Sequence, residues 1–181
     1  AAQKFACLLN FFEMSRALEG TDDDLREVVV ELRSAENDSA DIQGFQKWAL
    51  EQGEDSAWCC ESIRIELHED GMEGIDGTES FVNFANAEFG YGCFIPSCTQ
   101  EEIMQICCPE FNVGMLHLGR MTDNEVVVVH GVRRYSSYSG YGSSFEYVGP
   151  WTGQPNIQSI ITIDASTSNH FREDVVLRDI R

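Results

Sequence analysis

Hydrophobic and polar positions alternate along this chain in ways that predict both helices and strands. Residues 4–18 carry apolar side chains at helical spacing, which predicts an amphipathic helix. Residues 81–86, 126–129 and 159–164 are short apolar runs typical of strands, and the nearly continuous run at 126–129 is expected in a central strand covered on both faces. Residues 99–109 predict a second amphipathic helix. Because apolar strands alternate with helices, the pattern predicts an α/β fold.

Weaker signals fill the rest of the chain. The acid-rich stretch 19–41 surrounds one strand-like core at 28–32, and its acidic residues are expected to form a solvated edge. No internal repeat and no long linker divides the sequence, which indicates one domain. The remaining assignments are a short helix at 45–50, a half-buried strand at 63–67, a glycine-rich turn at 71–77, a short apolar run at 115–118 and a helix at 171–181.

The charge balance narrows the possible partners. The 181 residues contain 31 Asp and Glu against 12 Lys and Arg, so the formal net charge is −19. This excess argues against binding duplex DNA or anionic membranes through charge. An apolar content of 43% is too high for a disordered acidic tail. No apolar run reaches the roughly 18 residues of a membrane span, so we expect none.

Cysteine and histidine usage gives no sign of a metal centre. The seven cysteines include no C-x-x-C pair, and the four histidines lie far apart without zinc-ligand spacing. We therefore expect no metal and no cofactor. Unpaired thiols and the lack of a secretory leader favour a reducing compartment, and we expect an intracellular location in the nucleus or cytoplasm.

One segment combines a glycine-bearing loop with two carboxyl groups, which are features of ligand-binding and catalytic sites. A strand at 81–86 leads into Gly90-Tyr91-Gly92, and the helix that follows opens with Glu101 and Glu102. A glycine-bearing loop between a strand and a helix brings a ligand to the helix N-terminus. Adjacent helical residues point about 100° apart, so the two carboxyl groups cannot clamp one proton between them. Thr99 and Glu102 also fit a capping box, in which Glu102 bonds back to the Thr99 backbone.

These residues carry a resemblance to a known family. The segments Phe84-Ala85-Asn86, Gly90-Tyr91-Gly92, Gln100-Glu101-Glu102-Ile103 and Pro109-Glu110 resemble, in order, the signature of poly(ADP-ribose) glycohydrolases, and residues 135–141 and 161–165 are similar to that family's aromatic loop and next strand. The resemblance implies a macrodomain-like α/β fold, with a mixed sheet flanked by helices. It also implies one catalytic domain over residues 1–181, helical and acidic over about 1–60, macrodomain-like over about 61–181 and incomplete at its C-terminus.

The same resemblance implies a reaction and a set of site residues. Poly(ADP-ribose) or ADP-ribose is the expected partner, and the reaction is hydrolysis of ribose–ribose bonds that releases ADP-ribose. Glu102 matches the general acid and base, and Glu101 matches a residue that holds ribose hydroxyls. Tyr138 matches the adenine-stacking aromatic, and Asn86 helps to fix the distal ribose. The substrate-binding residues expected from the match are Glu73, Asn83, Asn86, Gly90, Tyr91, Gly92, Gln100, Tyr135 and Tyr138.

Two departures from the family pattern leave an alternative open. Tyr91 replaces the middle glycine of the loop, where a side chain crowds the ribose. The sequence also stops at Arg181, before the family's second phosphate loop, so a further chain or segment is expected to complete the domain. The alternative is a non-catalytic relative that serves as a structural subunit or binds ADP-ribose. A general carbohydrate glycosidase is less favoured because it needs two facing carboxylates.

Overall fold

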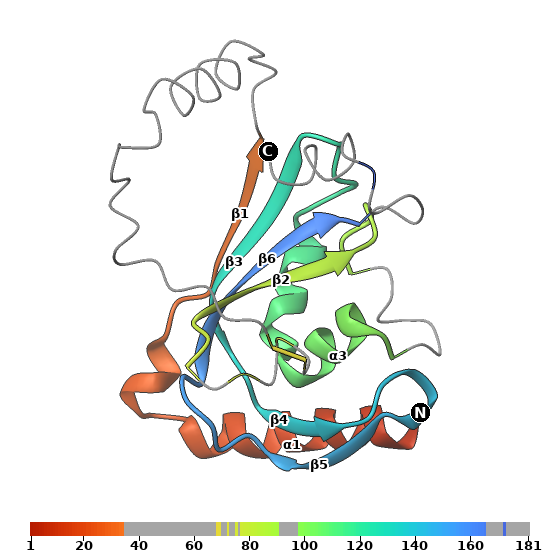
Figure 1. Cartoon of the computed structure of the whole chain (residues 1–181). Helices are drawn as coiled ribbons and strands as arrows, with labels where there is room; N and C mark the ends of the chain where they lie inside the picture. The colour runs from red at the N-terminus through yellow and green to blue at the C-terminus, as the bar shows by residue number, and fades with distance from the viewer. Residues whose placement is uncertain are drawn as a thin grey trace, which may run out of the picture.

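A mixed β-sheet lies at the centre of the molecule (Figure 1). The computed structural model describes residues 1–34, 68, 69, 72, 75, 77–90, 98–165 and 172. β2 (Ser80–Ala85) runs parallel to β6 (Ile157–Asp164), whereas β3 (Glu125–Arg133) is antiparallel to both of its neighbours, β1 (Val29–Ser34) and β6. The predicted α/β fold with a mixed sheet is therefore confirmed. Across the sheet the strands follow the order β1, β3, β6 and β2.

Burial along the strands follows the apolar pattern of the sequence. In β3, Val127 and Val129 are fully buried on one face and Val128 is 7% exposed on the other, so both faces are covered there. This matches the central strand predicted for the continuous apolar run. In β2 the alternation is strict, with Asn83 buried on the same face as its buried apolar neighbours while Phe84 is half exposed. β2 thus presents one face to the core.

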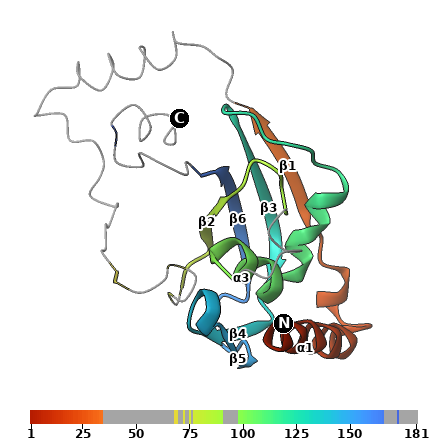
Figure 2. The same cartoon turned by 90° about the vertical axis from the view of Figure 1, so that its right-hand side faces the viewer.

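Two helical segments cover one face of the sheet (Figures 1 and 2). α3 (Gln100–Cys107) packs against β2, and the 3₁₀ helix η5 (Pro109–Leu116) packs against α3 and β3. Pro109 ends α3 because proline lacks the N–H that an α-helix needs. The short apolar run predicted at 115–118 lies at the end of η5 and in the turn that follows it. Leu116 in this run is 78% exposed.

A second layer lies across the lower end of the sheet in the view of Figure 1. It consists of α1 (Ala2–Leu18) and a hairpin of β4 (Ser136–Ser139) and β5 (Glu146–Pro150), with the 3₁₀ helix η6 (Gly142–Ser144) at the tip. The Asn10 side-chain amide donates to the Tyr135 carbonyl at 2.8 Å, and the Tyr147 N–H donates to Gln3 Oε1 at 3.0 Å. These bonds attach α1 to the hairpin.

The helix predicted at 4–18 is confirmed, but its burial was not foreseen. The apolar stripe of Phe5, Leu8, Leu9 and Phe12 points outward, with exposures from 37% to 64%. The opposite side of α1, which carries Cys7 and Asn10, is the buried one. Helical spacing identifies residues that share a face, whereas tertiary packing decides which face is covered.

The aromatic segment after β3 also differs from its prediction. The family resemblance predicts a loop at 135–141, whereas the structure forms β4, the first strand of the β4–β5 hairpin, there. Serine and glycine are poor strand formers, so pairing with residues 146–150 rather than local propensity makes this strand.

The predictions for 45–50 and 63–67, and almost all of 71–77 and 171–181, lie outside the described residues. No helix in the described part of the chain has the length and apolar character needed to cross a membrane.

Candidate active site

The carboxyl pair occupies the first turn of α3, directly beside the end of β2. Glu101 and Glu102 are 6% and 3% exposed, and both lie near the positive end of the helix dipole, which favours negative charge. α3 packs on β2, so the helix start lies close to the segment 86–90 that leaves the strand. The structure thus brings together the strand, the loop and the carboxyl groups that the sequence separates by about ten to twenty residues.

Glu101 connects this loop to the helix. Its carboxylate accepts backbone N–H bonds from Asn86 and Gly90, and the Gln105 side-chain amide donates to Oε1 at 3.3 Å. Burial and the neighbouring charge of Glu102 raise the pKa of Glu101 to about 7, against the opposing effect of the two backbone bonds. Glu101 therefore exchanges its proton near neutral pH.

Glu102 forms the capping box that the sequence predicted as an alternative role. The Thr99 N–H donates to Glu102 Oε2 at 2.7 Å, and the Thr99 hydroxyl donates to the same oxygen. Both bonds fall on one carboxylate oxygen, Oε2. The cap therefore orients the carboxyl group.

Gln100 is tied to the edge of β2 through both ends of its side chain. Its Nε2 donates to the Val82 carbonyl at 2.9 Å, and the Phe84 N–H donates to its Oε1 at 2.9 Å. This pairing imitates the hydrogen bonds of a neighbouring strand. The geometry gives Gln100 a positioning role, since it fixes the start of α3 against β2. A substrate contact by Gln100 stays a prediction.

The two asparagines of this region lie in different environments. Asn83 is fully buried, where its Nδ2 donates to Thr162 Oγ1 at 3.3 Å and its Oδ1 has no hydrogen-bond partner among the described residues. Asn86 is exposed, and its Oδ1 accepts the Glu88 N–H at 3.1 Å. Asn86 is thus available at the surface of the site, whereas Asn83 lies inside the core between β2 and β6.

The backbone conformation at Gly90, in the segment that follows β2, favours glycine. Its φ is +77°, in the left-handed region that side chains disfavour. A Cβ at this position would also lie 2.3 Å from the Met115 side chain. Three other predicted site residues, Glu73, Tyr91 and Gly92, lie outside the described residues.

Two tyrosines of the β4–β5 hairpin, Tyr138 and Tyr141, lie in distinct settings. Tyr138 is half-buried and stacks on Phe145, with ring centroids 5.7 Å apart. Tyr141 is 55% exposed, and its hydroxyl accepts the Gln100 N–H at 3.2 Å. The hairpin tip therefore contacts the first residue of α3, which links the aromatic segment to the carboxyl pair. The contact of Tyr141 with α3 depends on tertiary structure that the sequence pattern does not specify.

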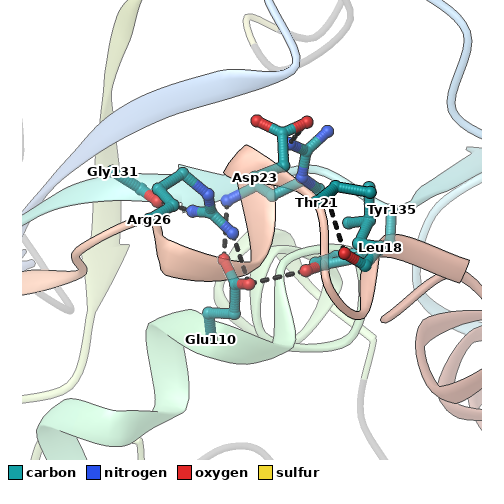
Figure 3. A network of polar contacts seen from close by, with 8 residues as sticks. Leu18, Thr21, Asp23, Arg26, Glu110, Gly131 and Tyr135 are labelled. Carbon is teal, nitrogen blue, oxygen red and sulfur yellow. Dashed lines mark hydrogen bonds and ion pairs between the residues drawn. The ribbon is translucent and has the colours of Figure 1, made fainter. Parts of the chain in front are cut away.

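Tyr135 belongs to a buried polar network that fastens the N-terminal segment to the domain (Figure 3). Its hydroxyl donates to Glu110 Oε1 at 2.6 Å, and Arg26 contacts the same oxygen at 2.5 Å. The Arg133 N–H donates to Glu110 Oε2 at 2.9 Å, and Arg26 also donates to the Gly131 carbonyl. With 2% of its surface exposed, Tyr135 has a structural role here, and a substrate contact stays a prediction.

The electrostatics of this network follow from its geometry. Burial alone would raise the pKa of Glu110, but hydrogen bonds from Arg26, Tyr135 and the Arg133 backbone outweigh it and lower the pKa. Burial and the Glu110 carboxylate raise the pKa of Tyr135 to about 12. Asp23, from the 3₁₀ helix η1 (Asp22–Leu25), pairs with the Arg133 guanidinium at 2.8 Å. The network therefore keeps Glu110 ionised and Tyr135 neutral at physiological pH.

Comparison with curated proteins identifies several relatives. The chain is 38% identical over 109 residues to poly(ADP-ribose) glycohydrolase 1 of Arabidopsis thaliana, covering 55% of this chain and 20% of that protein. It is 33% identical over 127 residues to the probable poly(ADP-ribose) glycohydrolase 2 of the same plant, covering 64% of this chain and 24% of that protein. A match to poly(ADP-ribose) glycohydrolase 1 of Caenorhabditis elegans is 39% identical over 66 residues, 36% of this chain and 8% of that protein. The chain thus spans a quarter or less of these relatives' length.

A family-level comparison covers more of the chain. The family described as "Poly (ADP-ribose) glycohydrolase (PARG), Macro domain fold" matches residues 51–181, which is well over half of the sequence. The matched range contains β2, α3 and the β4–β5 hairpin, the elements that form the candidate site. The macro domain fold also agrees with the mixed sheet and the helices that cover it. The chain therefore belongs to the poly(ADP-ribose) glycohydrolase family.

Proposed function

We propose that this protein hydrolyses the ribose–ribose O-glycosidic bonds of poly(ADP-ribose) and releases ADP-ribose. The observation that carries the proposal is the buried pair of Glu101 and Glu102 in the first turn of α3, beside the loop that follows β2. Membership of the family and the similarity to glycohydrolases of Arabidopsis thaliana support the choice of substrate. A buried carboxyl group at a helix start is suited to proton transfer to a sugar oxygen.

In the proposed mechanism one carboxyl group serves twice. Glu102 donates its proton to the leaving ribose oxygen, and the anomeric carbon develops oxocarbenium-ion character. The same carboxyl group, now ionised, then accepts a proton from the water that attacks this carbon. Thr99 holds this carboxyl group in place through two hydrogen bonds to Glu102 Oε2.

Glu101 has a separate role in this proposal. We assign it to the ribose hydroxyls, since adjacent helical residues point about 100° apart and the pair cannot share one reacting atom. A pKa of about 7 allows Glu101 to accept or to donate a hydrogen bond near neutral pH. Asn86 lies at the exposed edge of the site, where it is available to the distal ribose. Tyr138 is assigned to the adenine.

The experiment that tests the proposal combines turnover with binding. Purified protein is incubated with poly(ADP-ribose), and free ADP-ribose is quantified by chromatography; calorimetry on ADP-ribose gives the affinity separately. We expect both release and binding. Binding without release favours the alternative, a non-catalytic reader of ADP-ribose.

The observation that favours this alternative is Tyr91, where the family pattern has glycine. If Tyr91 obstructs the ribose, Tyr91→Gly is expected to raise ADP-ribose release from a low starting rate. If the site has adapted to the tyrosine, the change is expected to be nearly neutral. If neither the parent nor the Tyr91→Gly variant releases ADP-ribose, the enzymatic proposal is rejected. The alternative of a non-catalytic protein that binds ADP-ribose then takes its place.

An intracellular location, in the nucleus or cytoplasm, is part of the same proposal. It is supported by the four described cysteines, which are all unpaired thiols. Microscopy of a fluorescent fusion checks it.

A further inference from the structure

The buried thiols of α1 and α3 form a pair that the proposed function does not use. Cys7 lies on the buried face of α1 and is fully buried, and Cys107 is the last residue of α3 and is 2% exposed. The two side chains are hydrogen-bonded to one another. They come from segments one hundred residues apart in sequence, and both belong to the main hydrophobic core.

The surrounding hydrogen bonds fix this contact. Asn10, one helical turn after Cys7, donates through Nδ2 to the Tyr135 carbonyl at 2.8 Å and to Ser136 Oγ at 3.0 Å. The Tyr135 N–H in turn donates to the Cys107 carbonyl at 2.8 Å. The Ser136 hydroxyl is also hydrogen-bonded to the Cys7 sulfur. Tyr135 and Ser136 therefore connect the buried face of α1 to the end of α3.

From this geometry we propose that Cys7 and Cys107 form a redox-sensitive pair that closes to a disulfide on reaction with a peroxide. Two thiols that share a hydrogen bond are already neighbours, and a disulfide requires the sulfur atoms to approach to ~2.05 Å. The disulfide would join α1 covalently to the helix whose first turn carries Glu101 and Glu102.

The reaction is balanced by hydrogen peroxide as the oxidant. The Cys7 thiolate attacks one peroxide oxygen, the O–O bond breaks, and a sulfenic acid and hydroxide form. Cys107 then attacks the Cys7 sulfur and displaces the sulfenic oxygen as hydroxide. The proton of each thiol ends on a hydroxide. The two thiols lose two electrons in total, and the peroxide is reduced to two molecules of water.

The two thiols differ in the way that such chemistry requires. Hydrogen bonds from Cys107 and Ser136 lower the pKa of Cys7 in spite of its burial, which favours the nucleophilic thiolate. The bond to Cys7 and burial raise the pKa of Cys107, which suits the second, resolving role. The neighbouring Cys108, also buried, has its pKa raised to about 12 by burial and provides an unreactive comparison.

The test uses the reduced 181-residue chain with Cys59, Cys60 and Cys93 replaced by Ser, so that only Cys7, Cys98, Cys107 and Cys108 remain. After titration with hydrogen peroxide, intact mass and tandem mass spectrometry identify the cross-linked peptides. We expect a Cys7–Cys107 link that dithiothreitol reverses, with a melting temperature about 5–10 °C higher in the oxidised form. Cys108→Ser is expected to retain the link, whereas Cys7→Ser and Cys107→Ser lose it.

Two results would overturn the proposal. One is a link that involves Cys98 or Cys108 in place of Cys107. The other is oxidation of the protein to sulfinic acids with no Cys7–Cys107 peptide. Because the link is mapped in the parent protein as well, a Ser variant that fails to fold leaves the test valid. The outcome does not depend on glycohydrolase activity.

Discussion

At the scale of single residues, Glu101 and Glu102 at the start of α3 lie in different environments. Glu102 is oriented by Thr99 through one carboxylate oxygen, whereas Glu101 is held by the backbone of the loop that follows β2. The raised pKa lies at Glu101, the neighbour of the residue that we assign as general acid. The two carboxyl groups can therefore be tested separately, Glu101 through the pH dependence of stability and Glu102 through the rate of ADP-ribose release.

Replacing Glu101 is expected to change the pH dependence of stability. Its folded pKa of about 7 lies above the ordinary value of 4.5, so its contribution is complete below about pH 4.5 and is lost as the pH rises through 7. Glu101→Gln should therefore stabilise the fold by about 1–3 kcal/mol at pH 8 and have little effect at pH 4.5. Urea denaturation at the two pH values measures this. Equal effects at both pH values would show that burial does not disfavour the charge.

Tyr138 offers a residue-scale test of the nucleotide end of the site. Stacking on a base contributes on the order of 1–3 kcal/mol, so Tyr138→Ala should weaken ADP-ribose binding about tenfold or more. The contact with Phe145 will also cost some stability, so calorimetry is run below the melting temperature of the variant. Tyr138→Phe is the matched control and should keep the affinity. Unchanged affinity in the Ala variant would assign Tyr138 to packing alone.

At the scale of elements, the Glu110 network determines how the N-terminal segment joins the domain. Arg26 follows η1, Glu110 lies in η5 and Tyr135 precedes β4, so one carboxylate connects three elements. The side chains of Arg26 and Glu110 are only 15% and 18% exposed. A charge left unpaired at such a site is costly.

A matched pair of substitutions measures the strength of this connection. Arg26→Met leaves Glu110 buried without its ionic partner and should lower the free energy of unfolding by about 3 kcal/mol or more. Arg33→Met removes the exposed pair with Glu31, where Arg33 is 63% exposed, and should lower the free energy of unfolding far less than Arg26→Met does. Both values come from urea denaturation at pH 7. Similar losses in the two variants would contradict a buried network at Glu110.

The sequence predicts the elements whose signals are local. The helices at α1 and α3 and the strands β2, β3 and β6 follow from apolar spacing, and the capping box at Thr99 follows from a four-residue motif. The β4–β5 hairpin could not be predicted because its first strand is rich in serine and depends on a partner strand. The roles of Gln100 and Tyr135 also depend on contacts with distant segments. Those contacts are set by tertiary structure, which spacing along the chain does not specify.

At the scale of the whole molecule, the net charge of −19 constrains how a polyanion can bind. The overall negative charge repels poly(ADP-ribose) at long range, so the binding that we propose must depend on local contacts at the helix start and the loop. The site lies within residues 51–181, the range that matches the family, while α1 and η1 precede it and are fastened to it through Asn10 and Arg26. The N-terminal segment thus supports the domain from outside the matched range.

The most direct test of the account is the rate at which free ADP-ribose appears from poly(ADP-ribose) with Glu102→Gln. Glutamine keeps the shape of the side chain and still accepts the Thr99 bonds, but it has no proton to transfer. The rate should fall by about 10²–10⁴ while calorimetry shows ADP-ribose binding unchanged. Glu31→Gln, on the distant strand β1, controls for the loss of one negative charge and should retain the parent rate. A Glu102→Gln variant that turns over as fast as the parent would contradict the assignment of Glu102 as general acid.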